Sequence, residues 1–363
     1  MNLRKQVSQR FIFGFHGSEI NSELKDFFTN YPPAGIILFE INNNYESPKQ
    51  VSELITSIKK ITNDEKLIVC IDQEGGIVNH LPKPFTQFPS MKILGKIAEK
   101  TNKPELCFEF GELLAKELIT TGFNTPLVPV VDIRTNSAND YIGQRSLSES
   151  PELVAILSNE IIKGITSINS ACCLKHYPGH GDTTDDSHYI LPVIKITRDL
   201  LNKRELIPYR ENFKIDIPMV MAAHLLFPEI DPDFPCSLSE IFLKDILRNE
   251  LGFNNIIVSD DLNMSAMSEN FSLEELIKKG QNLLDIFLFG KNLTKQANAF
   301  EILFKENENK NKHNEAYSRV QIFKEKYCQS TKYGIKDFKE ASCNSRKFCA
   351  QIDKLKESYK LKD

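Results

Sequence analysis

The sequence contains no long hydrophobic run and carries no strong net charge. No stretch approaches the ~20 apolar residues of a membrane-spanning helix, and the apolar run at 11–15 is too short for the core of a signal peptide. A formal net charge of −4 over 363 residues gives no general attraction to nucleic acid or to anionic lipid. These absences predict a soluble, cytoplasmic protein with neither a nucleic-acid nor a membrane partner.

Cysteine pairs of the C-x-x-C type are also missing, so zinc-ribbon and thioredoxin-like centres lack support. The chain has eight cysteines, and Cys70, Cys172 and Cys173 lie in apolar, strand-like runs where a thiol behaves as a small hydrophobic side chain. Free, mostly buried thiols in a reducing compartment explain this placement more simply than four disulfides do.

Short apolar runs alternate with segments of helical spacing through most of the chain. The expected strands are residues 11–15, 35–39, 67–71, 125–131, 171–174, 219–223, 256–258 and 286–289. The expected helices between them include residues 50–61, 106–121, 151–165, 238–251 and 273–281. Eight such units predict an α/β fold closed into a (β/α)8 TIM-type barrel. The alternative, a doubly wound open sheet, usually has a G-x-G-x-x-G after its first strand, and this motif is absent.

Residues 1–330 are predicted to form this single barrel domain, and residues 331–363 a charged C-terminal tail. The segment from 293 to about 326 has a helical pattern that a polar run at 307–314 interrupts. In the tail, Phe348, Ile352, Leu355 and Tyr359 have the spacing of one helix face. We therefore expect an appended helix that docks on the barrel.

Polar side chains suited to binding or catalysis follow nearly every expected strand. In a TIM-type barrel such positions converge on the C-terminal face, where the active sites of this fold lie. The residues are His16, Asp72, Asp132, Arg145, Lys175, His176, His224 and Asp260. Loops that are merely solvated would not carry such groups after almost every strand.

The segment 175–188 reads KHYPGHGDTTDDSH and holds three histidines and three aspartates. One interpretation is a metal site, because His and Asp are ordinary ligands of zinc and manganese. Another is a proton-transfer device, because Asp186 and His188 are two residues apart and point the same way in an extended chain. A carboxylate beside an imidazole fixes its tautomer and stabilises its charged form. The simplest interpretation is a tight turn whose side chains cap backbone donors.

Two further segments end strands in acidic residues. The strand at 256–258 leads directly into Asp260 and Asp261, of which the first should face the barrel mouth and the second can cap the following helix. The strand at 67–71 leads into Asp72, followed by two glycines that let backbone approach a ligand closely. Either pattern alone is also typical of plain capping turns.

These three segments, in this order, resemble glycoside hydrolase family 3, and within it the single-domain β-N-acetylglucosaminidases (β-hexosaminidases). Residues 175–188 resemble the group's K-H-(F/Y)-P-G-H-G-D-T…D-S-H loop almost residue for residue, which is a highly specific signal. IDQEGG at 71–76, PVVDI at 129–133 with GQRS at 143–146, the AHLLFPEIDP run before residue 233, and SDDLNM at 259–264 resemble further family segments. The resemblance spans about residues 10–326.

The resemblance implies a retaining β-N-acetylglucosaminidase with Asp260 as nucleophile, His188 as acid/base and Asp186 as its partner. It further implies that Asp72, Arg145, Lys175, His176 and His224 bind the sugar, that no cofactor or metal is needed, and that the substrate is a small carbohydrate. Cell-wall (peptidoglycan) fragments are the substrate source that the resemblance suggests. A histidine with an ordinary pKa near ~6.5 can serve as the acid at neutral pH without a large shift.

The chain departs from the family pattern at several points. Ile77 stands where many relatives have arginine, and Leu147-Ser148 replaces the usual Phe-Gly. The segment 280–285 lacks the usual G-x-D run, so the expected eighth strand departs most from the family pattern.

Three other functions stay open at this point. A glycoside phosphorylase or another β-glycosidase would share the fold and these residues. A metal-dependent hydrolase would use His176, His180, Asp182 and His188. A sugar-binding protein without catalysis would not need Asp260, Asp186 and His188 together.

Overall fold

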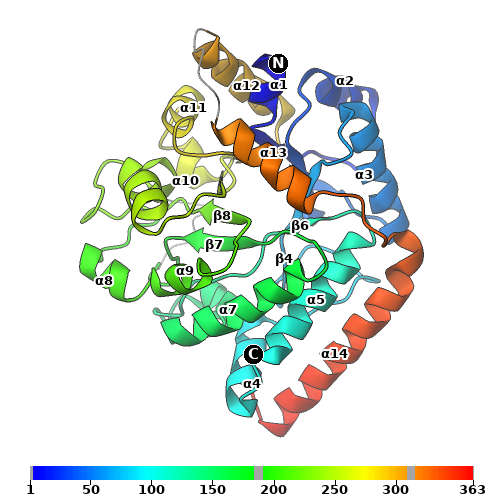
Figure 1. Cartoon of the computed structure of the whole chain (residues 1–363), viewed down its shortest axis with the longest axis vertical. Helices are drawn as coiled ribbons and strands as arrows, with labels where there is room; N and C mark the ends of the chain where they lie inside the picture. Colours follow the sequence, from blue (N-terminus) through cyan, green and yellow to red (C-terminus); the bar gives the residue numbers. More distant parts are fainter. Residues whose placement is uncertain (1–2, 184–190, 309–314, 363) are drawn as a thin grey trace.

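The computed structural model describes residues 3–183, 191–308 and 315–362. Within these residues, eight parallel strands lie at the centre of the molecule and helices surround them (Figure 1). The barrel strands are β1 (Phe11–Phe13), β2 (Gly35–Ile37), β3 (Ile68–Ile71), β6 (Thr125–Pro126), β7 (Cys173–Tyr177), β8 (Met219–Ala222), β9 (Ile256–Ser259) and β10 (Phe287–Phe289). An antiparallel hairpin, β4 (Gln73–Gly75) and β5 (Val78–Asn79), follows β3.

The strands form a closed ring. They pair in the orders β10-β1-β2-β3-β6 and β7-β8-β9. Two isolated parallel bridges, Val130 to Lys175 and Val258 to Ile286, join these two sheets at both seams. The predicted (β/α)8 barrel is therefore confirmed, including its eighth strand.

The helices cover the outside of the barrel. The longer ones are α2 (Ser22–Asn30), α3 (Pro48–Thr62), α4 (Met91–Thr101), α5 (Glu105–Ile119), α7 (Pro151–Thr166), η3 (Ile241–Glu250), α11 (Leu273–Gly280), α12 (Leu293–Asn307), α13 (Glu315–Tyr327) and α14 (Phe338–Ser358). The shorter ones are α1 (Leu3–Ser8), η1 (Glu40–Asn42), α6 (Asp140–Arg145), α8 (Arg198–Lys203), α9 (Ile207–Asn212), η2 (Cys236–Leu238), α10 (Ser265–Ser268) and η4 (Ile335–Asp337). The five predicted helices correspond to α3, α5, α7, η3 and α11, of which η3 is wound as a π-helix.

Helix α3 illustrates how the sequence sets these elements. Its buried side chains are Val51, Leu54, Ile55 and Ile58, one stripe at helical spacing. The Ser47 hydroxyl accepts a hydrogen bond from the Gln50 backbone N–H at 3.1 Å, and Pro48 occupies the first turn, where its missing N–H costs nothing.

Two predicted strands differ from the observed ones by more than two residues at one end. The regular ladder expected at 125–131 is limited to Thr125–Pro126, because Pro126 and Pro129 have no N–H to donate to a neighbouring strand. Beyond Pro126 the pairing continues as separate backbone contacts, such as the Val130 to Lys175 bridge. The fifth strand, expected at 171–174, runs instead over Cys173–Tyr177. Lys175 and His176 therefore belong to the strand itself and not to the loop after it.

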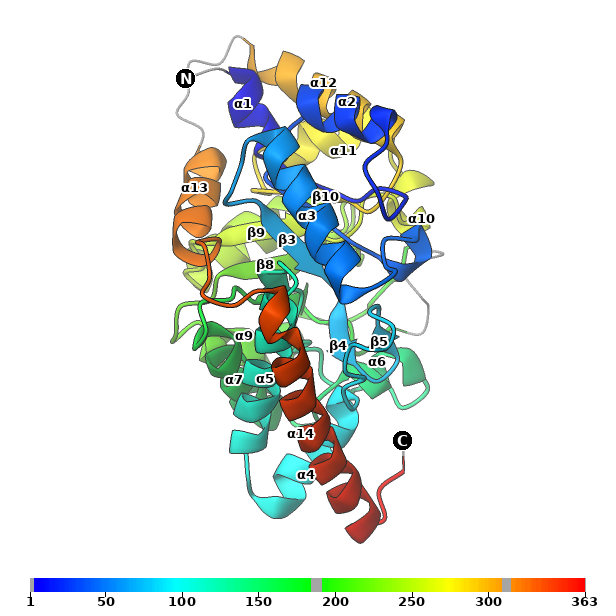
Figure 2. The same cartoon turned by 90° about the vertical axis from the view of Figure 1, so that its right-hand side faces the viewer.

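Apolar side chains fill the barrel interior, and helix α13 closes its N-terminal end. Val320, Phe323 and Tyr327 of α13 belong to the same buried cluster as the inward-facing strand residues Ile12, Ile68, Cys70, Cys173, Met219, Met221 and Val258. In Figure 2, α13 lies at one side of the strands and the loops around β5, α6 and α10 lie at the other. The interior is thus a packed core, and the C-terminal end of the barrel is the end at which an active site can lie.

The C-terminal tail forms the expected helix, α14, which packs along α5 and α4 (Figure 2). Phe348 and Ile352 are buried, and the Phe338 ring meets the Phe85 ring edge-on with centroids 4.9 Å apart. The prediction is wrong for Tyr359, which is 42% exposed because the helix ends at Ser358.

The cysteines are free thiols, and six of the eight are buried, as predicted. In the described part of the chain, none of the helices combines the length and the apolar character that crossing a bilayer requires.

Candidate active site

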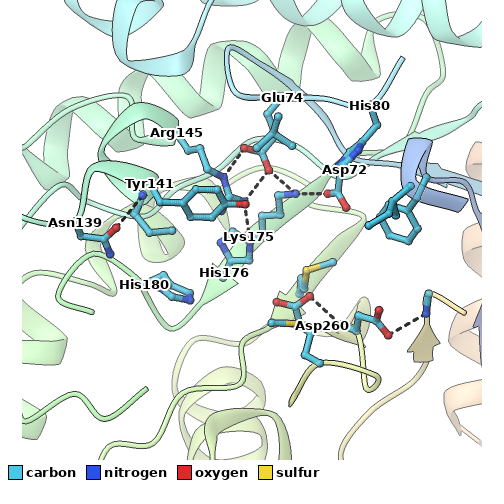
Figure 3. Close-up of a pocket in the computed structure, with 18 of the residues that line it drawn as sticks. Asp72, Glu74, His80, Asn139, Tyr141, Arg145, Lys175, His176, His180 and Asp260 are labelled. Carbon is cyan, nitrogen blue, oxygen red and sulfur yellow. Dashed lines mark hydrogen bonds and ion pairs between the residues drawn. The ribbon is translucent and has the colours of Figure 1, made fainter. Parts of the chain in front are cut away.

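A cavity of about 590 Å³ opens at the C-terminal ends of the barrel strands. Its walls come from the β3–β4 connection, helix α6, strand β7 and the loops after β9 and β10. The residues of its charged floor and walls include Asp72, Glu74, Arg145, Lys175, His176 and Asp260, and Figure 3 shows their side chains converging on one space. Four of the five predicted sugar-binding residues, together with the predicted nucleophile, thus share one cavity.

A buried ionic cluster forms one wall of this cavity (Figure 3). Lys175 Nζ pairs with the Asp72 carboxylate and lies 2.7 Å from Glu74 Oε1. Arg145 binds Glu74 through two parallel hydrogen bonds from one edge of its guanidinium, with Nε to Oε2 at 2.7 Å and Nη2 to Oε1 at 2.8 Å. Glu74 is completely buried and Lys175 almost so, whereas the Asp72 side chain is 20% exposed. Asp72 is therefore the member of this cluster with carboxylate surface left for a ligand.

The charges within the cluster are fixed by their neighbours. Burial alone would raise the pKa of Glu74, but Arg145 and Lys175 outweigh it and hold this pKa well below its ordinary value. Burial would likewise lower the pKa of Lys175, but Asp72 and Glu74 raise it above its ordinary value. At neutral pH Glu74 and Lys175 are therefore fixed ions, and neither can donate and then recover a proton.

His176 links this cluster to Asp132, which lies behind the cavity. Its Nδ1 is 2.7 Å from Asp132 Oδ2, and its Nε2 is 3.1 Å from Arg145 Nη2. Because the guanidinium can only donate, Nε2 must accept and Nδ1 must carry the proton. Both ring nitrogens therefore have protein partners, and His176 orients Arg145 as well as lining the cavity.

Asp132 is a hub that the sequence placed at a strand end without assigning it a role. The carboxylate is completely buried, and Oδ1 accepts hydrogen bonds from the backbone N–H groups of His176 and His180 at 3.1 and 2.8 Å. Burial alone would raise its pKa, but His176 and the N–H donors lower it overall. An ionised Asp132 thus holds both the end of β7 and the start of the loop that follows.

Asp260 lies on the wall across from the ionic cluster, directly after β9 (Figure 3). Its backbone N–H donates to the Ala222 carbonyl at 3.0 Å, which continues the ladder with β8. One carboxylate oxygen, Oδ1, accepts from the Asp261 N–H at 2.8 Å. The side chain is therefore held by its own backbone at the rim of a rigid strand.

The neighbouring Asp261 does not cap a helix, because α10 begins only at Ser265 and has Met264 as its N-cap. Instead, Asp261 Oδ1 accepts from the N–H groups of Asn263 and Gly290, both at 2.9 Å. It ties the loop after β9 to the loop after β10.

His224 is not among the residues that line this cavity. It is 1% exposed, its Nδ1 is 2.7 Å from Ser237 Oγ, and its Nε2 is 3.3 Å from the Asp261 carbonyl oxygen. Burial lowers its pKa, so the ring is neutral at pH 7. It supports the Asp260–Asp261 segment from behind. His16, the other histidine expected at a strand end, is exposed and does not line the cavity either.

The predicted acid/base pair, Asp186 and His188, lies outside the described residues. The described chain ends on that side at Thr183, whose carbonyl accepts hydrogen bonds from the side chains of Asn136 and Asn139 at 3.1 and 3.0 Å. His180 and Asn139 line the cavity, so this segment reaches the site.

The described residues include no group of three or more His, Cys, Asp or Glu side chains arranged to hold a metal ion. His180 Nδ1 is instead 2.9 Å from Thr183 Oγ1, and Asp182 pairs with Arg204. Burial and the nearby His176 lower the pKa of His180 to about 4.

Several residues of the cavity had no signal in the sequence. Tyr141 packs over the Arg145 guanidinium at 4.9 Å from the ring centroid, and Phe39 and Asn139 complete the walls. They lie in loops and short helices, whose paths the pattern of strands does not predict. Glu74, by contrast, stands in the IDQEGG segment quoted above. It is buried between two cations, which explains why an acidic residue occupies this position.

Comparison with known proteins gives consistent matches over this barrel. Residues 3–322 match the family model described as the glycosyl hydrolase family 3 N terminal domain. A beta-hexosaminidase of Nitrosomonas eutropha is 36% identical over 258 residues, which cover 69% of this chain and 72% of that relative.

Solved structures agree. A glycoside hydrolase family 3 beta-N-acetylglucosaminidase from Paenibacillus superposes with a TM-score of 0.87 at 30% identity, covering 96% of this chain and 68% of that chain. The structure of NagZ from Neisseria gonorrhoeae in complex with N-trifluoroacetyl-D-glucosamine gives a TM-score of 0.79 at 28% identity, covering 95% of this chain and 97% of that one.

Proposed function

Because the chain belongs to glycosyl hydrolase family 3, we propose that it is a retaining β-N-acetylglucosaminidase that removes terminal β-linked N-acetylglucosamine through a covalent intermediate on Asp260. The observation that carries this proposal is the placement of Asp260 across one cavity from the buried Asp72–Lys175–Arg145 cluster. Such a cavity provides an anionic nucleophile on one side and fixed polar groups for sugar hydroxyls on the other.

The first chemical step is the displacement of the aglycone. An Asp260 carboxylate oxygen attacks C1 of the sugar while the glycosidic C1–O bond breaks, and His188 in its protonated form gives its proton to the departing oxygen. In the second step His188 takes a proton from water, the water oxygen attacks C1, and Asp260 is released as a carboxylate. Two inversions at C1 retain the β configuration.

Asp186 is the proposed partner of His188, since a carboxylate stabilises an imidazolium and orients its ring. Two other acidic residues near the cavity, Glu74 and Asp182, are poorly suited to supply the proton. Glu74 is locked in ion pairs and has a strongly lowered pKa, and Asp182 is paired with Arg204.

Substrate positioning falls to the ionic cluster. Asp72 is the proposed acceptor for sugar hydroxyls, because it retains exposed surface. Lys175 pairs with it directly, Arg145 holds the neighbouring Glu74, and both cations are proposed to donate from the same wall. His176 is proposed to bind the sugar face while it orients Arg145, and His224 to stiffen the strand end that carries Asp260. Fixed charges of this kind orient a substrate without reorganising during reaction.

The wider setting is also part of the proposal. A fragment of cell-wall peptidoglycan that ends in N-acetylglucosamine is the proposed natural substrate. The free thiols suit a reducing compartment, which supports a cytoplasmic location. Residues 1–330 are proposed as the catalytic domain and 331–363 as an accessory segment, since the cavity draws no residue from α14.

An activity panel tests the proposal. Chromogenic β-N-acetylglucosaminide, β-glucoside and β-xyloside are compared with and without phosphate, and we expect turnover of the first substrate at a rate independent of phosphate. Faster turnover of the glucoside, or dependence on phosphate, would replace this function by another β-glycosidase or by a phosphorylase.

A further inference from the structure

The backbone that leads from β7 toward the proposed acid/base is held by side chains from two other parts of the fold. Asp132 accepts from the His180 N–H at 2.8 Å. Asn139 donates from its side chain to Thr183 O at 3.0 Å and to Thr183 Oγ1 at 2.7 Å. We call residues 179–183 the stem. Its position is set by these contacts five residues before His188.

A third contact holds the stem from outside the cavity, in the turn between α8 and α9. Arg204 Nη2 donates to Asp182 of the stem, and Arg204 Nε donates to Glu205 Oε1 at 2.6 Å. The Arg204 and Asp182 side chains are each 24% exposed, but that of Glu205 is only 2% exposed. A carboxylate is thus buried directly behind the stem.

The stem backbone packs on this carboxylate. Gly179 has a φ of +145°, which L side chains rarely adopt, and a Cβ added there would lie 2.5 Å from Glu205 Oε2 and 3.2 Å from Glu205 Cβ. A larger residue would therefore be strained and would force Glu205 to move. Among the described residues Oε2 accepts no hydrogen bond, and the atom is not accessible to solvent. Burying a carboxylate oxygen without a donor costs stability, so packing alone does not explain an acid at this position.

We propose that Glu205 is a positioning residue for the reaction: together with Arg204 it fixes the Gly179–Asp182 backbone, and through it the place from which the chain continues to His188. This inference rests on the proposed function, because it assigns Glu205 an effect on proton donation. Glu205 touches neither the sugar nor the nucleophile, since it does not line the cavity.

The charge of Glu205 depends on groups from three elements. Arg204 lies beside it in the same turn, Asp182 faces it from the stem, and Asp132 faces it from the loop after β6. Burial, opposed by Arg204 and assisted by the two aspartates, raises its pKa from 4.5 to about 7. Its contribution to stability is therefore largest below pH 4.5 and is lost as the pH rises to about 7. The ion pair with Arg204 forms fully only above that pH.

The test compares kcat/KM on an unactivated methyl β-N-acetylglucosaminide with that on the dinitrophenyl glycoside, whose leaving group needs no proton. For Glu205→Ala we expect a loss of roughly 10- to 100-fold on the methyl glycoside, because displacement of a catalytic group by about 1 Å can cost as much. On the dinitrophenyl glycoside we expect a loss below about threefold. Glu205→Gln keeps an acceptor for Arg204 and should restore most of the methyl glycoside activity.

Matched variants make the result decisive. Glu211→Ala removes an exposed carboxylate paired with Lys214 on the neighbouring helix and should change neither substrate. Arg204→Ala, at a partly exposed side chain, should reproduce the selective loss even where Glu205→Ala folds poorly. Equal losses on both substrates, or none, would overturn the inference.

His188→Ala belongs in the same series. If it shows the selective loss and the Glu205 and Arg204 variants do not, the positioning role alone is refuted. If His188→Ala shows no selectivity, the assignment of the acid in the proposed function fails instead.

Discussion

The two ends of the barrel both contain buried charged residues, yet they use them in opposite ways. At the N-terminal end, Asp285 accepts from Arg248 at 2.6 Å, from Arg319 at 2.7 Å and from the Ile257 N–H at 2.7 Å. Lys324 of α13 reaches Asp64 and lies 2.5 Å from Gln9 Oε1. These contacts fasten α13 over the end of the barrel, and each of these charged groups is paired with another group of the protein.

At the C-terminal end, the same residue types border a cavity. Lys175 and Arg145 are buried, as Lys324 is, and Arg145 pairs with the buried Glu74. Lys175, however, pairs with Asp72, whose surface is open to the cavity. Position relative to the strands distinguishes the two ends. Asp64 and Asp285 precede their strands, whereas Asp72 and Asp260 follow theirs, and in this fold only the latter positions reach the active-site face.

The sharpest way to test this comparison is the substitution Asp260→Asn. It should lower kcat by a factor on the order of 10⁴ or more while leaving the fold intact, because only the covalent step is lost. A 2-fluoro glycoside should label the wild type on the peptide that contains Asp260. Asp261→Asn is the matched control and should cost much less, since Asp261 ties two loops together. Labelling on Asp261 alone would refute the assignment.

His188→Ala should give the next largest effect, and one that depends on the substrate. General acid–base groups contribute about 10²- to 10⁴-fold, so a natural glycoside should lose that much rate. With an aryl glycoside, breakdown of the intermediate should become limiting and azide should rescue it. Asp186→Asn should show the same pattern more weakly. Equal losses on both substrates without rescue would mean that His188 only positions the sugar.

The N-terminal end should respond in stability and not in catalysis. Asp285→Ala removes one carboxylate acceptor from two arginines and the acceptor of a backbone N–H. Breaking a buried pair in this way costs roughly 3 kcal/mol. Denaturant unfolding should show that loss, with kcat per folded molecule unchanged. Asp285→Asn keeps one acceptor oxygen, so its free energy of unfolding should lie between those of the wild type and Asp285→Ala. A lower kcat under conditions in which the variant is fully folded would contradict the assignment of stability to the N-terminal end and catalysis to the C-terminal end.

Removal of the tail after Tyr327 should have a smaller effect of the same kind. The truncation exposes the surfaces of α4 and α5 that α14 covers, including the contact of Phe85 with Phe338, but leaves the cavity and α13 in place. We expect a lower melting temperature with activity retained. An unchanged melting temperature would mean that α14 contributes no net stability to the barrel.

The sequence was sufficient for those features that depend on local pattern. The eight strands, the helix stripe at Val51 to Ile58 and the acid at the end of β9 each follow from residues close in the chain. The family resemblance added the order of the motifs. Local sequence pattern could not predict contacts made between distant segments. Nothing near Glu74 in the sequence indicates that Arg145 and Lys175 enclose it, and nothing near Glu205 indicates that it packs against Gly179. The end of β6 was missed because apolar character outweighed the two prolines in the prediction.

The smallest expected effect is that of metal removal. The spacing of His176 and His180 suggests metal ligands, but both have other partners: Asp132 and Arg145 occupy the ring nitrogens of His176, and Thr183 lies at Nδ1 of His180. A metal would have to displace an ion pair and a guanidinium to reach them. Treatment with a chelator should therefore leave kcat/KM unchanged, and elemental analysis should find no stoichiometric zinc or manganese. One tightly bound metal per chain, with activity restored only by that metal, would reassign residues 175–188 as a metal site and remove His188 from the role of acid.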